Sequence, residues 1–399
     1  MLEDGTDYGA VVRDRREAMN WTRKRLAEEY GRALGEDIQE ETIRIYEQRN
    51  TLPTKHLNRR AILAGLLGLT PMTLGVTVPP KVAPRLVVPA VDLAAALDVA
   101  EYRSALTHYW HQGVYGALEE IARRVVCLHN KVPYVRGAEQ QQMTRLLCGF
   151  NSLTACELNR LGFYEIADSY HTKAIRLAIE KNQYDVEGFA RWQQAINLVD
   201  RGHYEAALRT LERAKALQNK LPGPLNGYVT CMLSEAHART AQDKAEVAEA
   251  MAFADEAEQA LGEQTELNSY LLRFDRVRYV LQLSMVFVGP ARQALHLPDE
   301  ALNLIEAEVP FFGERRFEQI RQIFCNLIQA RAAIDKKEYA YGANLLIDMA
   351  AMMEELHSTD LLPDVEALYQ RLKETSYKHS VEVARLGLAL TQVKYPELF

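Results

Sequence analysis

A short block of residues recurs in the chain and constrains its fold more than any other feature. The first copy carries Gly162 and Tyr164, the second carries Gly202 and Tyr204 40 residues later, and a third copy lies at 337–342. Alanines follow at matching offsets in the first two copies: Ala167, Ala174, Ala207 and Ala214. A glycine at a tight turn, then an aromatic residue, then alanines at close helix crossings are typical of stacked helical hairpins. The pattern predicts that several hairpins stack, because no single hairpin can bury its apolar face.

The remainder of the sequence favours an all-α fold. Weaker copies of the block surround 245–257 and 298–307, and strand signals are almost absent. Hydrophobic residues make up 48% of the 399 residues and charged residues 25%, which is the composition of a folded globular protein. The longest apolar stretches, 61–69 and 281–289, are much shorter than the roughly 20 residues that cross a bilayer. No membrane-spanning segment is therefore expected.

A proline-rich segment separates the N-terminal part of the chain from the rest. Residues 76–89 contain Pro79, Pro80, Pro84 and Pro89, and proline cannot donate the amide hydrogen bond that a helix needs. We therefore expect three parts: an N-terminal domain at 1–75, a linker at 76–92 and a large helical domain at 93–399.

The N-terminal part has the spacing of four short helices. The apolar period predicts a first helix near 11–19, and Thr22 is placed to cap a second. Residues 37–40 have the spacing of a capping box that opens a third helix. A fourth helix is expected over 57–67, with Gly68 as its C-cap. The residues expected in the core are Leu26, Ala27, Ile43, Tyr46 and Leu67.

Charge is distributed unevenly between these parts. Residues 8–60 hold 12 Lys and Arg against 9 Asp and Glu, whereas the whole chain has a net charge of −7. A basic N-terminal part beside an acidic body is compatible with a small nucleic-acid-binding domain, because neutralised phosphates supply sequence-independent affinity.

No motif in the sequence indicates catalysis, a metal site or export. The five cysteines have no paired spacing and are expected to be reduced, and the acidic N-terminus lacks a secretory signal, so a cytoplasmic location is expected. His108 and His111 lie three residues apart but have no acidic or thiol partner at a suitable spacing. Phosphate-binding glycine loops and nucleophile elbows are absent from the sequence. We expect neither an enzyme nor a cofactor.

The N-terminal part resembles the helix-turn-helix domains of the Cro and lambda-repressor type. The match rests on 8–19, 21–28, 42–49, 52–53 and 66–69, and covers about 70 residues. The resemblance implies that the third helix enters the major groove of DNA and that the start of the second meets phosphates. It assigns base edges to Gln39, Glu40, Glu41 and Arg44, phosphates to Thr22, Arg23 and Lys24, and flanking backbone to Arg49 and Asn50.

Two features depart from that family. The turn between the second and third helices is several residues longer than usual, through 32–37, and Glu40 and Glu41 carry negative charge toward an approaching duplex. These carboxylates also complement the helix dipole and can accept a hydrogen bond from cytosine. A domain that binds a protein instead of DNA is the alternative interpretation.

The whole arrangement is similar to the RRNPP family of intracellular peptide-pheromone receptors. The resemblance implies a tetratricopeptide-like right-handed superhelix that binds a short peptide and a homodimer that binds a double-stranded operator. Amides can donate and accept hydrogen bonds to a peptide backbone, and Arg suits a terminal carboxylate. The candidate ligand residues are Asn159, Arg160, Trp192, Gln193, Gln194, Asn197, Asn326, Gln329 and Arg331. The alternative for these residues is a solvated groove or ordinary hydrogen bonds between repeats. The alternative for the protein is a tetratricopeptide interaction scaffold or inhibitor with a vestigial DNA-binding head.

Overall fold

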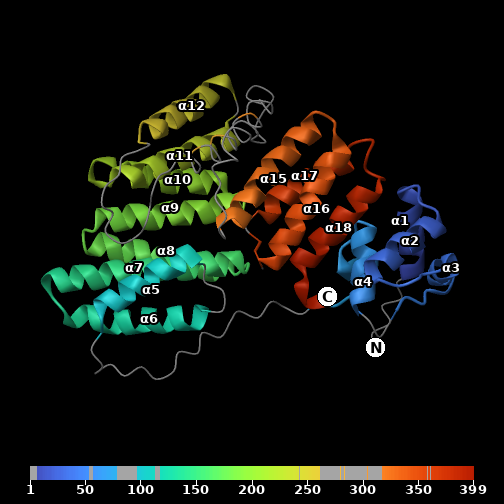
Figure 1. Cartoon of the computed structure of the whole chain (residues 1–399), viewed down its shortest axis with the longest axis horizontal. Helices are drawn as coiled ribbons and strands as arrows, with labels where there is room; N and C mark the ends of the chain where they lie inside the picture. Colours follow the sequence, from blue (N-terminus) through green and yellow to red (C-terminus); the bar gives the residue numbers. More distant parts are fainter. Residues whose placement is uncertain are drawn as a thin grey trace. The chain divides into compact units, whose positions relative to one another are not determined.

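The computed structural model describes residues 7–53, 57–78, 97–112, 117–241, 243–260, 279, 283, 303, 317–356, 358–359 and 361–399. Throughout these ranges the regular structure is helical, in α-helices and short 3₁₀ turns, as predicted (Figure 1). The chain forms two compact units. One unit joins residues 1–82 with 329–399, and the other comprises 83–328. Most of the predicted linker and the weak copy at 298–307 lie outside the described residues.

The N-terminal segment of the first unit, which we call the head, consists of four short α-helices and a 3₁₀ turn. They are α1 (Tyr8–Ala18), α2 (Arg23–Leu34), α3 (Glu40–Arg49), α4 (Leu57–Leu66) and η1 (Pro71–Leu74). All five residues predicted for the core are buried: Leu26, Ala27, Ile43, Tyr46 and Leu67. They form one apolar cluster with Val12, Tyr30 and Leu63 from the neighbouring helices.

The helix ends agree with the sequence at two places and disagree at one. The Thr22 hydroxyl accepts a hydrogen bond from the Arg25 amide at 3.1 Å, which confirms the predicted cap of α2. Gly68 follows α4 with a positive φ of 64°, as a C-cap requires. The capping box at 37–40 is wrong, because α3 begins at Glu40 and its N-cap, Gln39, makes no side-chain cap bond. The Asp37 carboxylate instead accepts a hydrogen bond from Gln39 Nε2 at 2.7 Å.

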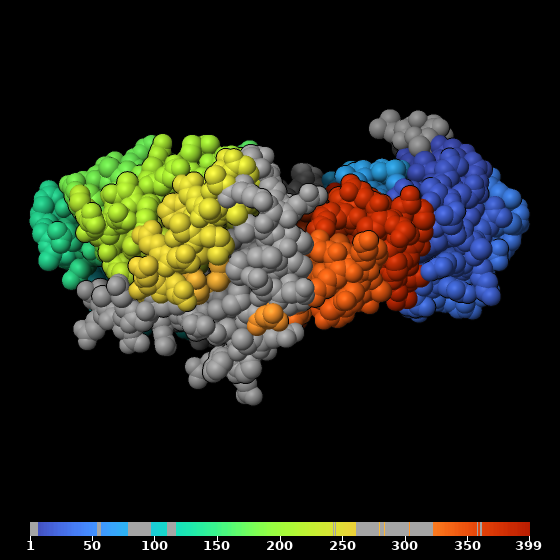
Figure 2. Space-filling model, turned by 90° about the horizontal axis from the view of Figure 1, so that it is seen from above, coloured from blue at the N-terminus to red at the C-terminus, as the bar shows by residue number. Residues whose placement is uncertain are grey.

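The first unit also contains a group of C-terminal helices, of which the last two segments contact α4 of the head. They are the end of α15 (Phe317–Asp335), α16 (Tyr339–Glu355), α17 (Leu362–Lys373), α18 (Val381–Lys394) and η5 (Pro396–Leu398). Helix α4 contacts α18, and in Figure 2 the blue atoms of the head abut the red atoms of the C-terminal helices. The predicted domain 93–399 therefore extends across both compact units, because its last helices associate with the head.

Two glycines make the contact between α4 and α18 possible. A Cβ added to Gly65 would lie 2.9 Å from the Leu388 Cα atom, and one added to Gly387 would lie 2.8 Å from the Gly65 carbonyl oxygen. Every residue of α4 from 61 to 66 is buried. A helix that is apolar on all sides needs partners on all sides, and here the head and α18 supply them.

The second unit is a series of α-helices in which each after the first contacts the next, and the first contacts the third (Figure 1). They are α5 (Val99–Gln112), α6 (Leu118–Lys131), η2 (Val132–Tyr134), α7 (Gly137–Arg160), α8 (Tyr164–Glu180), α9 (Tyr184–Asp200), α10 (Tyr204–Lys215), η3 (Gln218–Lys220), α11 (Gly223–Thr240) and α12 (Lys244–Gln259). Helix α9 also contacts both α7 and α11. Alternate helices therefore pack together as well as neighbours, as in a stack of hairpins.

The predicted repeat block coincides with the turns between these helices. Gly162 and Gly202 have positive φ values of 81° and 74°. All four predicted alanines, Ala167, Ala174, Ala207 and Ala214, are fully buried. The third copy differs, because Lys337 occupies its positive-φ position. Its glycine, Gly342, lies inside α16, where a Cβ would come within 2.8 Å of the Ile334 side chain.

Candidate nucleic-acid interface and ligand site

Helix α3 has a buried face that fixes it in the head and an exposed face. The buried face carries Ile43, Tyr46 and Glu47. The exposed face and its approach carry Gln39, Glu40, Glu41, Gln48 and Arg49, with Arg44 half-exposed among them. The sequence-predicted base-reading residues are thus together on one helix, on the side that the head leaves uncovered within the described part of the chain.

Arg44 is held by two neighbours on this surface. Its Nε donates to the Glu41 carboxylate at 2.6 Å and its Nη1 donates to the Gln48 side-chain oxygen at 2.6 Å. The hydrogen bond from Arg44 lowers the pKa of the Glu41 carboxyl below its ordinary value. A guanine that binds Arg44 through two hydrogen bonds must therefore displace Glu41.

A buried carboxylate joins α3 to α1 and to the start of α2. The Glu47 side chain is fully buried and accepts hydrogen bonds from Arg16 Nε at 2.6 Å and from Arg23 Nε at 2.7 Å. Burial alone raises the pKa of the Glu47 carboxyl, but the hydrogen bonds from the two arginines outweigh it and the pKa is lowered. Arg23, which the resemblance assigns to phosphate, is thus also a structural tie between α2 and α3.

The remaining predicted DNA contacts divide into structural and exposed residues. Asn50 adopts a left-handed φ of 49°, and its Oδ1 accepts a hydrogen bond from the Gly9 amide at 3.1 Å. Asn50 therefore ends α3 and ties it to α1, a role that the sequence did not indicate. Thr22 caps α2, whereas Lys24 and Arg49 are exposed.

Most candidate ligand residues of the second unit are buried between helices. The Asn197 amide lies 2.7 Å from His171 Nε2 and links α9 to α8. The Gln193 side-chain oxygen accepts a hydrogen bond from Cys156 Sγ at 3.2 Å, and Arg160 pairs with Glu157 at 2.8 Å. The Asn197 and Gln193 bonds join different helices, as the alternative interpretation expects, whereas the Arg160 bond lies within α7. Gln194 is half-buried on α9.

Two other candidates carry buried polar atoms without partners. Asn159 is 1% exposed and Trp192 is 4% exposed. The Asn159 Oδ1 and Trp192 Nε1 atoms have no hydrogen-bond partner in the described part of the chain, and Ser152 Oγ shares this condition. The helices that carry them, α7 and α9, contact each other, and the Trp192 ring lies 4.7 Å from that of Tyr228 on α11. A buried polar atom without a partner is costly, which makes these atoms candidates for a bound ligand.

The three candidates on α15 differ in their surroundings. Asn326 is buried and accepts a hydrogen bond from Gln322 at 2.8 Å, and Gln329 is half-buried. Arg331 forms a buried ion pair with Asp364. Removal of a buried Arg from its carboxylate is unfavourable, so a structural role explains Arg331.

Two further side chains of the second unit have strongly shifted pKa values because they are buried. Burial lowers the pKa of His171 to about 3 and raises the pKa of Cys148 to about 12, so neither is charged at neutral pH. The cysteines form no disulfide. Within the described residues no group of three metal-binding side chains occurs, and no helix is long and apolar enough to cross a membrane. The side chain of His111 lies outside what the structure describes.

No protein-family model, no curated protein and no solved structure matches this chain.

Proposed function

We propose that the protein is a DNA-binding transcriptional regulator whose head binds duplex DNA through α3. The observation that carries the proposal is the exposed face of α3, which is held from behind by a hydrophobic core and by the buried Glu47 carboxylate. A rigid helix with polar side chains on an open face is the element that enters a major groove in helix-turn-helix proteins. Arg23 connects this helix to the start of α2, where phosphates would be met.

The charges on this face are mixed, which is compatible with sequence-specific contact. Arg44 and Arg49 provide positive charge toward the end of α3, whereas Glu40 and Glu41 lie in its first turn. In the proposed complex Arg44 exchanges Glu41 for guanine, and the carboxylates accept from cytosine N4. Recognition then depends on the base pair. An incorrect base pair offers Arg44 no guanine, so Arg44 stays bonded to Glu41.

We further propose that a short peptide controls this activity in a cytoplasmic homodimer built on tetratricopeptide-like repeats. The support lies in Asn159 and Trp192, whose unpartnered atoms are one acceptor and one donor. A peptide backbone offers the complementary donor and acceptor. A dimer would present two heads to the half-sites of a two-fold operator.

The DNA proposal is tested with a variant that loses charge from α3 alone. Arg44→Ala with Arg49→Ala removes two positive charges from the exposed face, and both residues lie outside the core. We expect affinity for a duplex recovered from a random pool to fall at least about tenfold, and the slope of log affinity against log salt to fall by about 1 to 2. Fluorescence anisotropy at several salt concentrations measures both quantities.

A matched control removes equal charge elsewhere in the same unit. Arg371→Ala with Lys378→Ala takes two positive charges from the end of α17 and the turn that follows it. Its affinity and salt slope are expected to stay near those of the unaltered protein. Equal losses in both double variants would mean that binding follows net charge and would reject an interface on α3.

The second candidate function is a protein-interaction scaffold, and the acidic first turn of α3 favours it. Glu40 and Glu41 would then face a basic partner rather than a duplex. In that case the Arg44 and Arg49 double variant would leave duplex binding at the same weak level as before.

A further inference from the structure

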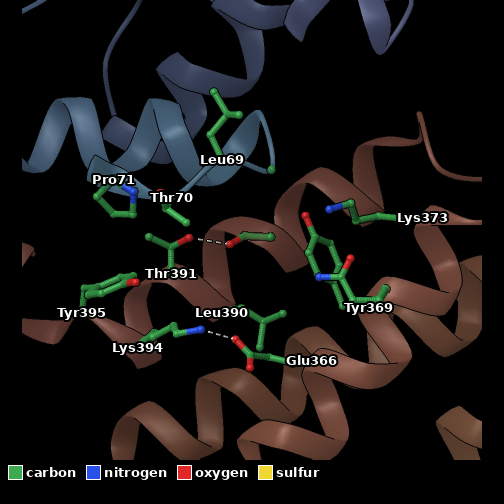
Figure 3. Close-up of a pocket in the computed structure, with 13 residues that line it drawn as sticks. Leu69, Thr70, Pro71, Glu366, Tyr369, Lys373, Leu390, Thr391, Lys394 and Tyr395 are labelled. Atoms are coloured by element: carbon green, nitrogen blue, oxygen red, sulfur yellow. Dashed lines mark hydrogen bonds and ion pairs between the residues drawn. The ribbon is translucent and has the colours of Figure 1, made fainter. Parts of the chain in front are cut away.

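A pocket of about 150 Å³ lies in the first unit where the end of the head meets α17 and α18 (Figure 3). Residues 68–71, which follow α4, form one side. The other side carries Tyr369 and Lys373 from α17 and Leu390 and Lys394 from α18. The pocket is therefore built by residues that are about 300 positions apart in the sequence.

One corner of this pocket has an excess of positive charge. The Lys373 ammonium lies 5.1 Å from the centre of the Tyr369 ring, and within the described residues no carboxylate pairs with it. Arg15 lies behind the same corner, where its Nε donates to the Leu67 carbonyl at 2.7 Å. Burial and the nearby Arg15 both lower the pKa of Lys373. Two neighbouring cations in a partly desolvated place favour a bound anion.

The opposite corner is already neutral. Lys394 Nζ pairs with the Glu366 carboxylate at 2.6 Å, as Figure 3 shows. An anion would therefore bind on the Lys373 side. The Tyr369 hydroxyl also borders that side, and burial raises the pKa of Tyr369 to about 12, so it remains a hydrogen-bond donor at neutral pH.

The walls of the pocket and its size limit the shape of the ligand. Leu69, Pro71, Leu390 and Tyr395 supply apolar surface. A cavity of this volume holds a molecule of about the size of benzene. Apolar walls with one cationic corner suit a compact body that carries a single carboxylate.

We propose that this pocket binds a small organic carboxylic acid, with the carboxylate at Lys373 and the Tyr369 hydroxyl and the apolar body against Leu69 and Leu390. The bound acid contacts the end of the head and α17 and α18 at once. Its binding therefore stabilises the association of these elements. The site is separate from α3 and from the buried polar atoms of α7 and α9, so it is a second point of control.

The test uses 4-fluorobenzoate as the probe and ¹⁹F NMR of the full chain as the readout. We expect saturable binding, and we expect neutral 4-fluorobenzamide to bind at least about tenfold more weakly, because it cannot form the charge-assisted bond. This comparison needs no variant. Equal binding of acid and amide, or no saturable binding of either, would overturn the proposal.

A pair of variants locates the probe. Lys373→Met is expected to lower the affinity for 4-fluorobenzoate at least about tenfold. Lys378→Met, an exposed change a few residues away, is expected to leave this affinity unchanged. Unchanged binding in Lys373→Met would place the probe elsewhere and reject the assignment. Full displacement of the probe by equimolar inorganic phosphate would reject the carboxylic acid class, because phosphate has no apolar body.

Discussion

Glu47 is a buried carboxylate that links three helices of the head. Its carboxylate is fully buried and receives hydrogen bonds from two arginines on two other helical segments. A buried carboxylate of this kind specifies how α1, α2 and α3 meet, since any other arrangement would leave charges unpaired. The orientation of the exposed face of α3 follows from the same bonds.

Replacement of Glu47 by Gln is expected to destabilise the head by about 3 kcal/mol, because the buried Arg16 loses the buried carboxylate and keeps only the exposed Glu17 as a charged partner. Urea unfolding followed by circular dichroism measures the loss. The exposed change Glu41→Gln serves as the control and is expected to cost less than about 1 kcal/mol.

The same pair of proteins gives a pH dependence. The folded-state pKa of Glu47 is below its ordinary value of 4.5, so its contribution is complete above that value and is lost as the pH falls through the lowered pKa. The stability difference between the unaltered protein and Glu47→Gln should therefore be constant near neutral pH and shrink below about pH 4.5. A difference that stays constant down to pH 2 would contradict the assigned pKa direction.

A substitution of Asn159 should affect ligand binding without lowering the stability of the protein. Its Oδ1 atom is buried and has no partner among the described residues, so Asn159→Leu should leave stability unchanged or raise it by about 1 kcal/mol. Linear peptides recovered by display selection on the unaltered protein should lose at least about tenfold in affinity for this variant.

Asn197→Leu is the matched control for that experiment. It removes the hydrogen bond to His171 and should lower the stability of the protein, whether or not it changes the affinity for the peptides. A destabilised Asn159→Leu variant that keeps its peptides would contradict a ligand role for Asn159.

Single residues differ in how well the sequence predicted them. Local rules predicted Thr22 and Gly68 correctly, because a cap depends on the few residues around it. The capping box failed because Gln39, and not Asp37, precedes the first residue of α3, so the helix begins two residues later than predicted. The bond from the Gly9 amide in α1 to the Asn50 side chain was not predicted, because it joins residues 41 positions apart and no local pattern contains it.

At the scale of elements, the head is attached to the C-terminal helices mainly where α4 crosses α18. Gly65 and Gly387 allow the two backbones to touch. Around this crossing the Trp21 indole donates to the His379 carbonyl at 2.9 Å, and Arg385 pairs with Glu29 at 3.0 Å. The contact thus combines close backbone packing with polar bonds at its rim.

Gly387→Ala is expected to loosen this crossing. The new Cβ would lie 2.6 Å from the Tyr369 hydroxyl and 2.8 Å from the Gly65 carbonyl, so the helices must separate at a cost of about 1 to 3 kcal/mol. Hydrogen exchange should show faster opening of α4 and α18 together.

The control for this change is Ala367→Ser, which alters an exposed position on α17 and should leave exchange in α4 and α18 unaltered. Slow exchange that persists in Gly387→Ala would mean that the crossing does not hold the head.

The sequence predicted these elements better than it predicted their partners. Apolar spacing gave the helices of the head, and the repeat block gave the turns at Gly162 and Gly202. The partner of α4 could not be predicted, because α18 lies about 300 residues further along the chain and no pattern in its sequence indicates that it packs against α4. The same limit hid the pocket, since both of its sides belong to these distant segments.

For the molecule as a whole, the two compact units differ from the parts that the sequence suggested. The proline-rich segment suggested that the head is a separate body, whereas the head and residues 329–399 form one compact unit. Helix α18 and η5 contact α4 of the head directly. The proposed acid pocket lies within those contacts.

Selection of DNA from a random duplex pool by the full chain tests the central claim most directly. The proposed dimeric regulator should enrich a two-fold symmetric site whose half-sites lie about 10 base pairs apart or a multiple of that spacing. The enrichment should disappear with the Arg44→Ala and Arg49→Ala double variant and persist with the control of equal charge. Recovery of a pool with no sequence enrichment from a well-folded protein would contradict the proposed function.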